Sequence, residues 1–92
     1  MPLIDGATVL RRDERMIMRR GKDGWALVDP YRRTLLKLNP SAQLIWDLLD
    51  GTHTLAQVLE RLKQEFQADE AVLEKDLQHF VAQLRQREMI SG

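Results

Sequence analysis

Residues 35–51 read LLKLNPSAQLIWDLLDG and join a strand-like pattern directly to a helical one. This stretch begins with an apolar run that is typical of a strand and then meets Asn39-Pro40. Asn is a preferred helix cap, and Pro is tolerated in the first turn of a helix. Four apolar residues follow on one helical face, and Gly51 ends the helix because it tolerates a left-handed backbone. These four are Ala42, Ile45, Trp46 and Leu49. The stretch therefore predicts an abrupt corner from a strand into a helix.

Upstream of this corner, the pattern predicts two more short strands. Residues 16–18 and 25–28 are apolar runs, and residues 33–38 form the strand that leads into the corner. The segments between them, 20–24 and 29–32, contain the Gly and Pro residues that tight turns prefer. Three short runs joined by short turns predict a three-stranded antiparallel sheet over residues 15–38.

Downstream of the corner, the sequence predicts two further helices. Thr54 and Gln57 have the spacing of a capping box, so a second helix begins here. A third helix begins near Asp69. The apolar faces are Leu55, Val58, Leu59, Leu62 and Phe66 in the second helix, and Leu73, Leu77, Phe80, Val81 and Leu84 in the third. The predicted fold is therefore α+β, a three-stranded antiparallel sheet followed by a three-helix bundle over residues 39–92 that resembles a winged helix-turn-helix.

Length and composition bound the class of protein. We expect one domain over 92 residues, with residues 1–14, which lack periodicity, as a loosely held arm. The chain has no cysteine, which excludes disulfides, thiol nucleophiles and thiolate metal sites. No apolar run approaches the roughly 20 residues that cross a bilayer, and the start does not resemble a signal peptide. We therefore expect a cytoplasmic protein that does not bind membranes.

The formal net charge of zero hides an asymmetry between the two halves of the chain. Residues 1–38 carry nine Lys and Arg against five acids, and residues 39–92 carry five against nine. One interpretation is that the two solvated halves attract each other weakly. The other is that the basic strand region favours an acidic partner.

The predicted strand over residues 33–38 is the first candidate binding element. Thr34, Leu36 and Leu38 fall on one face, which we expect to join the core, and Arg33, Leu35 and Lys37 fall on the other. If the strand lies at a sheet edge, its free backbone groups can pair with another chain, whose acids the two cations would attract. The alternative is an ordinary half-buried strand with solvated cations.

The third predicted helix carries a mixed stripe beside its apolar face. Val72, Asp76, His79 and Gln83 have helical spacing and could line a groove against the strand over residues 33–38. The alternative is the normal polar shoulder of an amphipathic helix.

Nothing in the sequence indicates an enzyme, a cofactor or a metal site. His53 and His79 are the only histidines, and neither has a second ligand at metal-site spacing. The start of the third helix carries Asp69, Glu70 and Glu74, which would repel a phosphate backbone. We therefore predict no nucleic-acid partner, and a DNA-binding regulator remains an alternative.

Residues 24–90 resemble the PqqD family, named for pyrroloquinoline quinone (PQQ) synthesis protein D. The family shares its fold with the RiPP recognition element, the peptide-binding module of pathways that modify ribosomally made peptides. The matching residues are Leu38-Asn39, Asp50-Gly51, Thr54, Asp76-Leu77, Phe80 and Leu84. The sequence departs from the family after the third helix, where Arg87 is followed by Glu88-Met89-Ile90 without the glycine of many members.

The resemblance implies a peptide chaperone without catalytic activity. Members bind the leader segment of a precursor peptide as an added strand and present it to a modifying enzyme, such as a radical SAM protein or a leader peptidase. Carried onto this chain, the implied peptide-binding residues are Arg33, Thr34, Leu35, Leu36 and Lys37 in the strand, and Lys75, Asp76, His79 and Gln83 in the helix. The pathway stays open between PQQ and others, such as a lasso-peptide pathway. A self-associating protein that uses the same edge strand to form a homodimer is a further alternative.

Overall fold

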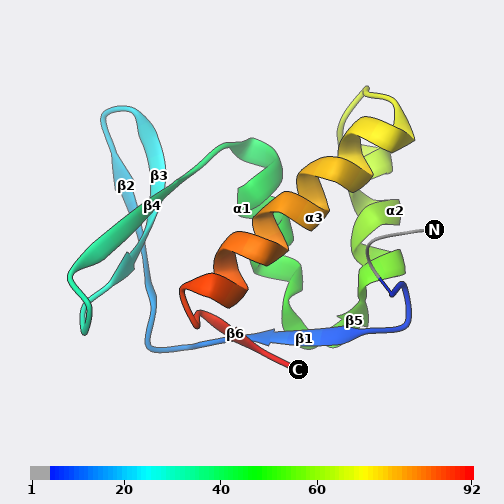
Figure 1. The fold of residues 1–92 in the computed structure, drawn as a ribbon. Helices are drawn as coiled ribbons and strands as arrows, with labels where there is room; N and C mark the ends of the chain where they lie inside the picture. The colour runs from blue at the N-terminus through cyan, green and yellow to red at the C-terminus, as the bar shows by residue number, and fades with distance from the viewer. Residues whose placement is uncertain (1–4) are drawn as a thin grey trace.

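The computed structural model describes residues 5–92, which alternate between strands and helices (Figure 1). The elements are β1 (Val9–Arg12), β2 (Ile17–Gly21), β3 (Gly24–Asp29), β4 (Thr34–Leu38), α1 (Pro40–Leu48), β5 (Asp50–Thr54), α2 (Leu55–Glu65), α3 (Glu70–Gln86) and β6 (Ile90–Ser91). The predicted α+β class is confirmed, with three helices and antiparallel strands in the described residues. The likeness to a winged helix-turn-helix stays an interpretation.

The predicted antiparallel meander is present as the sheet β2-β3-β4. Gly21 pairs with Gly24 across the β2–β3 turn, where Gly24 has a φ of 109° that few other residues adopt. Val28 pairs with Ile17 on one side and with Leu35 on the other. The order leaves β2 and β4 at the two edges of this sheet.

The corner between β4 and α1 has the predicted cap. The Asn39 side chain accepts a hydrogen bond from the backbone N–H of Ala42 at 2.8 Å, and Pro40 occupies the first helical turn. This bond satisfies a helix N-terminal donor that would otherwise lack a partner. The helix ends earlier than predicted, at Leu48 with Leu49 as its C-cap, and Gly51, with a φ of 83°, lies in β5 and not at the helix end. The strand therefore passes into the helix within one residue.

The other two helices also begin and pack as the pattern predicts. Thr54 and Gln57 form a reciprocal capping box at the start of α2, with bonds of 3.1 and 2.8 Å. The predicted apolar face of α3 is buried throughout. The core gathers these faces with the inner side of β4 and with Leu10 and Met89, and its fully or largely buried members include Leu27, Leu38, Ile45, Trp46, Leu62, Leu77 and Leu84.

The prediction of a single sheet is wrong, because a second one has the strand order β5-β1-β6. It lies below the helices, while β2-β3-β4 stands to one side of them (Figure 1). Its strands were missed because they are short, and because Asp50–Thr54 is polar and lies between two predicted helices. Within this sheet, Gly51 has a φ of 83°, a left-handed backbone conformation that a residue with a Cβ atom rarely adopts.

The expected loosely held arm over residues 1–14 is also corrected. Val9–Arg12 form β1, which pairs with both β5 and β6, and Leu10 is fully buried in the core. A four-residue strand gives too little alternation to be recognised alone, and its partners lie far away in the sequence. The part of the predicted arm over residues 1–4 lies outside the described residues.

Candidate functional site

Strand β4 has one paired edge and one open edge. Its residues pair with β3 from Asp29 opposite Thr34 to Trp25 opposite Leu38. No strand in the described part of the chain pairs with its other side. About half of the backbone N–H and C=O groups of an edge strand point away from its neighbour, and these groups can pair with another chain. An edge of five residues is therefore available to an extended peptide.

The two faces of β4 differ as the alternation predicts, with an exception at its start. Leu36 and Leu38 are buried in the core, whereas Leu35 and Lys37 are exposed on the opposite face. Thr34, expected in the core with Leu36, is exposed instead. It stands at the first position of the strand, directly after the turn. Only two of the three predicted inward side chains are therefore buried.

Arg33 belongs to the turn before β4 and not to the strand. Its φ of 56° lies in the left-handed region, which is uncommon for a residue with a side chain. The strand begins one residue later, at Thr34. The predicted strand was therefore one residue too long at its start, and Arg33 lies at the end of the open edge.

The turn that leads into β4 is fixed by Asp29. Its buried carboxylate accepts bonds from the backbone N–H groups of Tyr31 at 2.9 Å and Arg32 at 3.1 Å, and from the Arg32 guanidinium at 3.2 Å. Burial alone would raise the pKa of Asp29, but these hydrogen bonds and the Arg32 charge lower it below its ordinary value. The carboxylate therefore stays ionised inside the protein.

Arg32 joins this turn to the end of α3. Its guanidinium donates to the backbone carbonyl of Arg87 at 3.1 Å and pairs with the carboxylate of Glu88. These contacts connect the start of β4 to the C-terminal end of α3, and the sequence did not predict them. The Asp-Pro-Tyr-Arg turn was visible in the sequence, but its long-range partner was not.

A hollow of about 120 Å³ lies between the end of β4, the start of α1 and one side of α3, and we call it the α3 hollow. Its apolar lining comes from Ala42, Ile45 and Phe80, which are buried. Its polar lining consists of Lys37 from β4, Asn39 and Ser41 from the corner, and Asp76, His79 and Gln83 from α3. The hollow therefore offers hydrogen-bond donors and acceptors above an apolar base.

The hollow brings together part of the predicted set of site residues. Lys37, Asp76, His79 and Gln83 line it, although Lys37 is 39 positions before Asp76 in the sequence. Lys75 is exposed on α3 and does not line it, because it is one position out of phase with Asp76. Arg33, Thr34, Leu35 and Leu36 do not line it either. Thr34, Leu35 and Leu36 belong to the edge strand and Arg33 to the turn before it, and none of them to the hollow.

Leu35 lies elsewhere than expected. The family resemblance further implies that Leu35, the third helix and the corner form pockets that select the leader sequence, but Leu35 lines a different hollow, on the outer face of the sheet with Val28 and Lys37. The reason is the pleat of the strand, because the neighbouring Leu36 occupies the inward position.

The α3 hollow continues toward the start of α3. A second, shallower depression of about 350 Å³ shares Asn39, Ser41 and Asp76 with it and extends to Phe66 and Leu73. The corner was expected to border a pocket, but Asn39 and Ser41 were not among the predicted site residues. Their sequence signal was the Asn39-Pro40 corner between a predicted strand and a predicted helix.

The site carries no arrangement typical of a metal centre. Within residues 5–92, no three His, Asp or Glu side chains are placed to hold a metal ion. His53 lies outside the hollow, with its Nδ1 atom 3.1 Å from Asp50 Oδ1. Hydrogen bonds from the Thr52 hydroxyl and backbone, together with His53, lower the pKa of Asp50. In the same described part of the chain, no helix is long and apolar enough to cross a membrane.

The family model described as "Coenzyme PQQ synthesis protein D (PqqD)" matches residues 24–90, most of the chain. The chain belongs to the PqqD family. Curated members include the "PqqA binding protein" of Xanthomonas oryzae pv. oryzae (strain PXO99A), 35% identical over 94% of this chain and 91% of that protein. Another is the "PqqA binding protein" of Xanthomonas axonopodis pv. citri (strain 306), which is 33% identical over the same shares.

Solved structures support the PqqD-like fold. The solution structure of the PqqD truncation of Methylobacterium extorquens PqqCD, described as a functional and stand-alone RiPP recognition element, superposes with a TM-score of 0.76. It is 25% identical to this chain and covers 99% of it, and the match spans 97% of that chain. "Lasso peptide synthetase B1 complexed with the leader peptide" superposes with a TM-score of 0.75 at 24% identity, over 92% of this chain and all of that one. The latter similarity establishes the fold alone.

Proposed function

We propose that this protein binds the leader segment of a ribosomally made precursor peptide and presents it to a peptide-modifying enzyme. The observation that carries the proposal is the open edge of β4 beside the polar hollow of α3. Membership of the PqqD family supports it, as do relatives that are named PqqA binding proteins. The protein would supply binding and positioning and no chemistry of its own.

The leader would add to the sheet as a strand beside β4. Its backbone would pair with the open groups of Thr34–Leu38, which gives affinity with little dependence on sequence. Because its side chains alternate, those that point inward would enter the hollow, and those that point outward would lie beside Leu35. Leu36 would contribute backbone groups only, since its side chain is buried.

The hollow would provide sequence specificity. Asp76 accepts hydrogen bonds, Lys37 donates them, and His79 and Gln83 can do both. A peptide side chain that forms hydrogen bonds with these groups replaces the water bound to them. A side chain that cannot do so leaves them without partners, which weakens the binding free energy. Arg33 and Lys75 would lie at the rim of this site, where their charges favour acidic residues of the leader.

The identity of the enzyme and the pathway is the finer part of the proposal. A radical SAM protein would receive the peptide in a PQQ-type pathway, and a leader peptidase would receive it in a lasso-type pathway. Both use a peptide that the ribosome makes, which is why we assign the protein to the cytoplasm.

Two other functions remain to be compared with peptide binding, namely DNA binding and homodimer formation. A DNA-binding regulator would need cations on α3, but its first turns carry Glu70, Glu74 and Asp76 around the single cation Lys75. A homodimer through β4 would use the same open edge, so it would compete with the peptide.

A fluorescence-polarisation titration tests the proposal. Labelled leader segments of small peptides encoded beside the gene are titrated with the protein, and a labelled DNA duplex serves as the control. We expect saturable binding of one leader at micromolar or tighter affinity, about −8 kcal/mol, and none of the duplex. Failure of every leader to bind would refute the peptide function, and light scattering over a concentration series would then show whether β4 mediates a dimer.

A further inference from the structure

The outer face of the sheet β2-β3-β4 carries an exposed apolar row. Ile17, Val28 and Leu35 are direct cross-strand neighbours on the three strands. Ile17 is 43% exposed and Leu35 is 55% exposed, and Val28 between them is partly exposed. No element of the described residues packs on this face, because the helices lie against the other one (Figure 1). Three apolar side chains in contact across a sheet form a surface that favours a partner.

Cations surround this row. A hollow of about 240 Å³ extends from Val28 and Leu35 to the β2–β3 turn, and Arg19, Lys22 and Lys37 line it. Asp23 is its only acidic lining residue. Over residues 15–38 the chain has seven Lys and Arg against two acids. The outer face therefore presents an apolar row within a field of positive charge.

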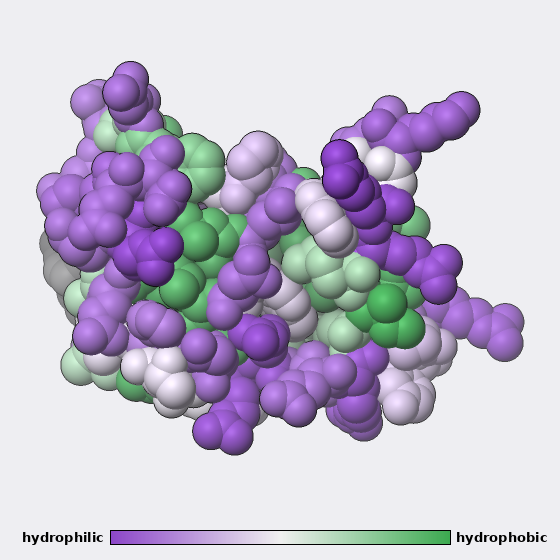
Figure 2. Space-filling model, turned by 180° about the vertical axis from the view of Figure 1, so that it is seen from behind, coloured by the Kyte–Doolittle hydropathy of each residue, from purple (hydrophilic) through white to green (hydrophobic). Residues whose placement is uncertain are grey.

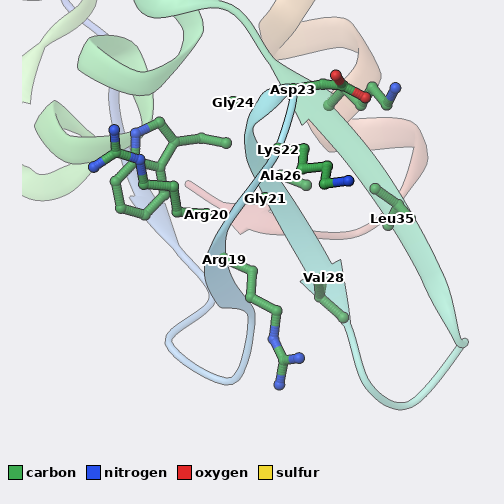
Figure 3. Close-up of a pocket in the computed structure, with 11 residues that line it drawn as sticks. Arg19, Arg20, Gly21, Lys22, Asp23, Gly24, Ala26, Val28 and Leu35 are labelled. Atoms are coloured by element: carbon green, nitrogen blue, oxygen red, sulfur yellow. The ribbon is translucent and has the colours of Figure 1, made fainter.

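Figure 3 shows how the hairpin positions these side chains. Val28 and Leu35 lie on neighbouring strands, and Arg19 projects beside them from β2. Arg20 projects to the other side, where its guanidinium carbon lies 6.0 Å from the centre of the Trp25 ring. Seen from behind, the sheet end of the molecule, at the right of Figure 2, shows a hydrophobic group among hydrophilic side chains. Arg19 and Arg20 thus follow each other in sequence but serve different faces.

We infer that the outer face docks an acidic protein surface that presents an apolar side chain, and that this surface belongs to the enzyme that receives the peptide. The apolar row would bury the partner's apolar side chain, and the cations would pair with its carboxylates. The identity of the partner as the enzyme rests on the proposed function. The chemistry of the surface does not, since it follows from the charges and exposure of this face.

A protein fits this face better than the other two occupants. Duplex DNA would satisfy the cations but leave Ile17, Val28 and Leu35 without an apolar surface to bury. A second copy that used the same face would bring like charges together. The acidic start of α3 in a second copy, with the half-exposed Val72, has part of this chemistry, so self-association of the parent that Arg19→Glu abolishes would overturn the inference.

The position of the face suits simultaneous binding. The α3 hollow lies between β4 and α3, and the apolar row extends from β4 across the outer face to β2, so that the two sites adjoin only at Leu35 and Lys37. A leader added at the edge of β4 would leave Ile17 and Arg19 on β2 uncovered, because β3 and β4 stand between. The enzyme would therefore be held against the sheet while the leader lies at its edge.

Two variants of the full chain test this inference without touching the peptide site. Arg19→Glu reverses a charge of the outer face, and Ile17→Ser removes part of the apolar row. Arg61→Glu is the matched control, because it makes the same charge change on α2, at the other end of the molecule (Figure 1). Binding is measured by titration with the peptide-modifying enzyme encoded beside the gene, and separately with the labelled leader.

We expect each outer-face variant to weaken enzyme binding about tenfold or more, with leader binding unchanged and Arg61→Glu without effect. Unchanged leader binding also shows that the variants fold. Enzyme binding that is absent in the parent, or equal in parent and variants, would overturn the inference, as would duplex DNA binding that Arg19→Glu abolishes. Failure of the leader alone to bind would instead refute the proposed function and leave the result for the outer face standing.

Discussion

Leu35 and Leu36 are neighbours in β4, but their side chains lie on opposite faces of the sheet, 55% and 9% exposed. The same substitution should therefore change the free energy of unfolding little at one position and strongly at the other. Leu35→Glu should change the free energy of unfolding by no more than about 0.5 kcal/mol, as exposed substitutions usually do. Leu36→Glu should cost about 3 kcal/mol or more, because it buries an unpaired carboxylate. Denaturation followed by Trp25 and Trp46 fluorescence measures both.

The same pair separates folding from peptide binding. Leu35→Glu should bind the leader more weakly than the parent while remaining folded, because its carboxylate would replace an apolar contact of the added strand. Leader binding equal to that of the parent would place the added strand elsewhere. The Leu36 variant provides the contrast, since any loss there accompanies unfolding.

The polar lining of the α3 hollow should determine leader affinity independently of stability. His79→Ala and Gln83→Ala each remove one hydrogen-bonding group from the hollow, and we expect about fivefold to tenfold weaker leader binding, corresponding to about 1 kcal/mol each. Gln86→Ala is the matched control, because Gln86 is exposed on the same helix and does not line the hollow. A polarisation titration compares the three variants with the parent. Equal affinities for all four proteins would remove the hollow from the site.

The elements that sequence periodicity predicted are those with local signals. The start of α1 is specified by Asn39 and Pro40 and that of α2 by Thr54 and Gln57, all within one turn of the helix that each begins. The sheet β5-β1-β6 has no such signal, because Val9 pairs with Thr54 and Arg11 with Ser91. Pairing over such separations depends on tertiary packing, which a single sequence does not display.

The candidate site also has features that the sequence predicts locally and features that depend on tertiary packing. Alternation along β4 placed Leu36 in the core, and helical spacing placed Asp76 and His79 on one side of α3. Neither pattern specifies how β4 is oriented relative to α3, so the sequence could not show that Leu35 faces away from the hollow. The orientation depends on contacts such as that of Arg32 with the end of α3, which join residues 55 positions apart.

The buried carboxylate of Asp29 should stabilise the fold in a pH-dependent way. Its pKa is lowered in the folded protein, because hydrogen bonds from Tyr31 and Arg32 outweigh the opposing effect of burial. Its contribution is therefore complete above the unfolded pKa of about 3.9 and is lost as the pH falls through the lower folded value. Asp29→Asn should lower the urea midpoint at pH 7, and the difference from the parent should shrink below about pH 4. A difference that is constant from pH 7 to pH 3 would assign the effect to packing and not to charge.

Gly51 should resist substitution because of its backbone conformation. Its φ of 83° is strained for a residue with a Cβ atom, whereas the Arg11 side chain that such an atom would meet is exposed and can move. Gly51→Ala should therefore reduce the free energy of unfolding by about 1–2 kcal/mol, in spite of the lower entropy of the unfolded chain.

Gly21→Ala is the matched control, because a Cβ there meets only Gly24 O, at an ordinary 3.8 Å, and we expect it to be neutral or slightly stabilising. Urea denaturation measures both variants, and equal effects at the two positions would contradict the role assigned to the positive φ of Gly51. Leader binding should survive in Gly51→Ala, because β5 lies outside the site, so a loss of stability without a loss of affinity is the expected result.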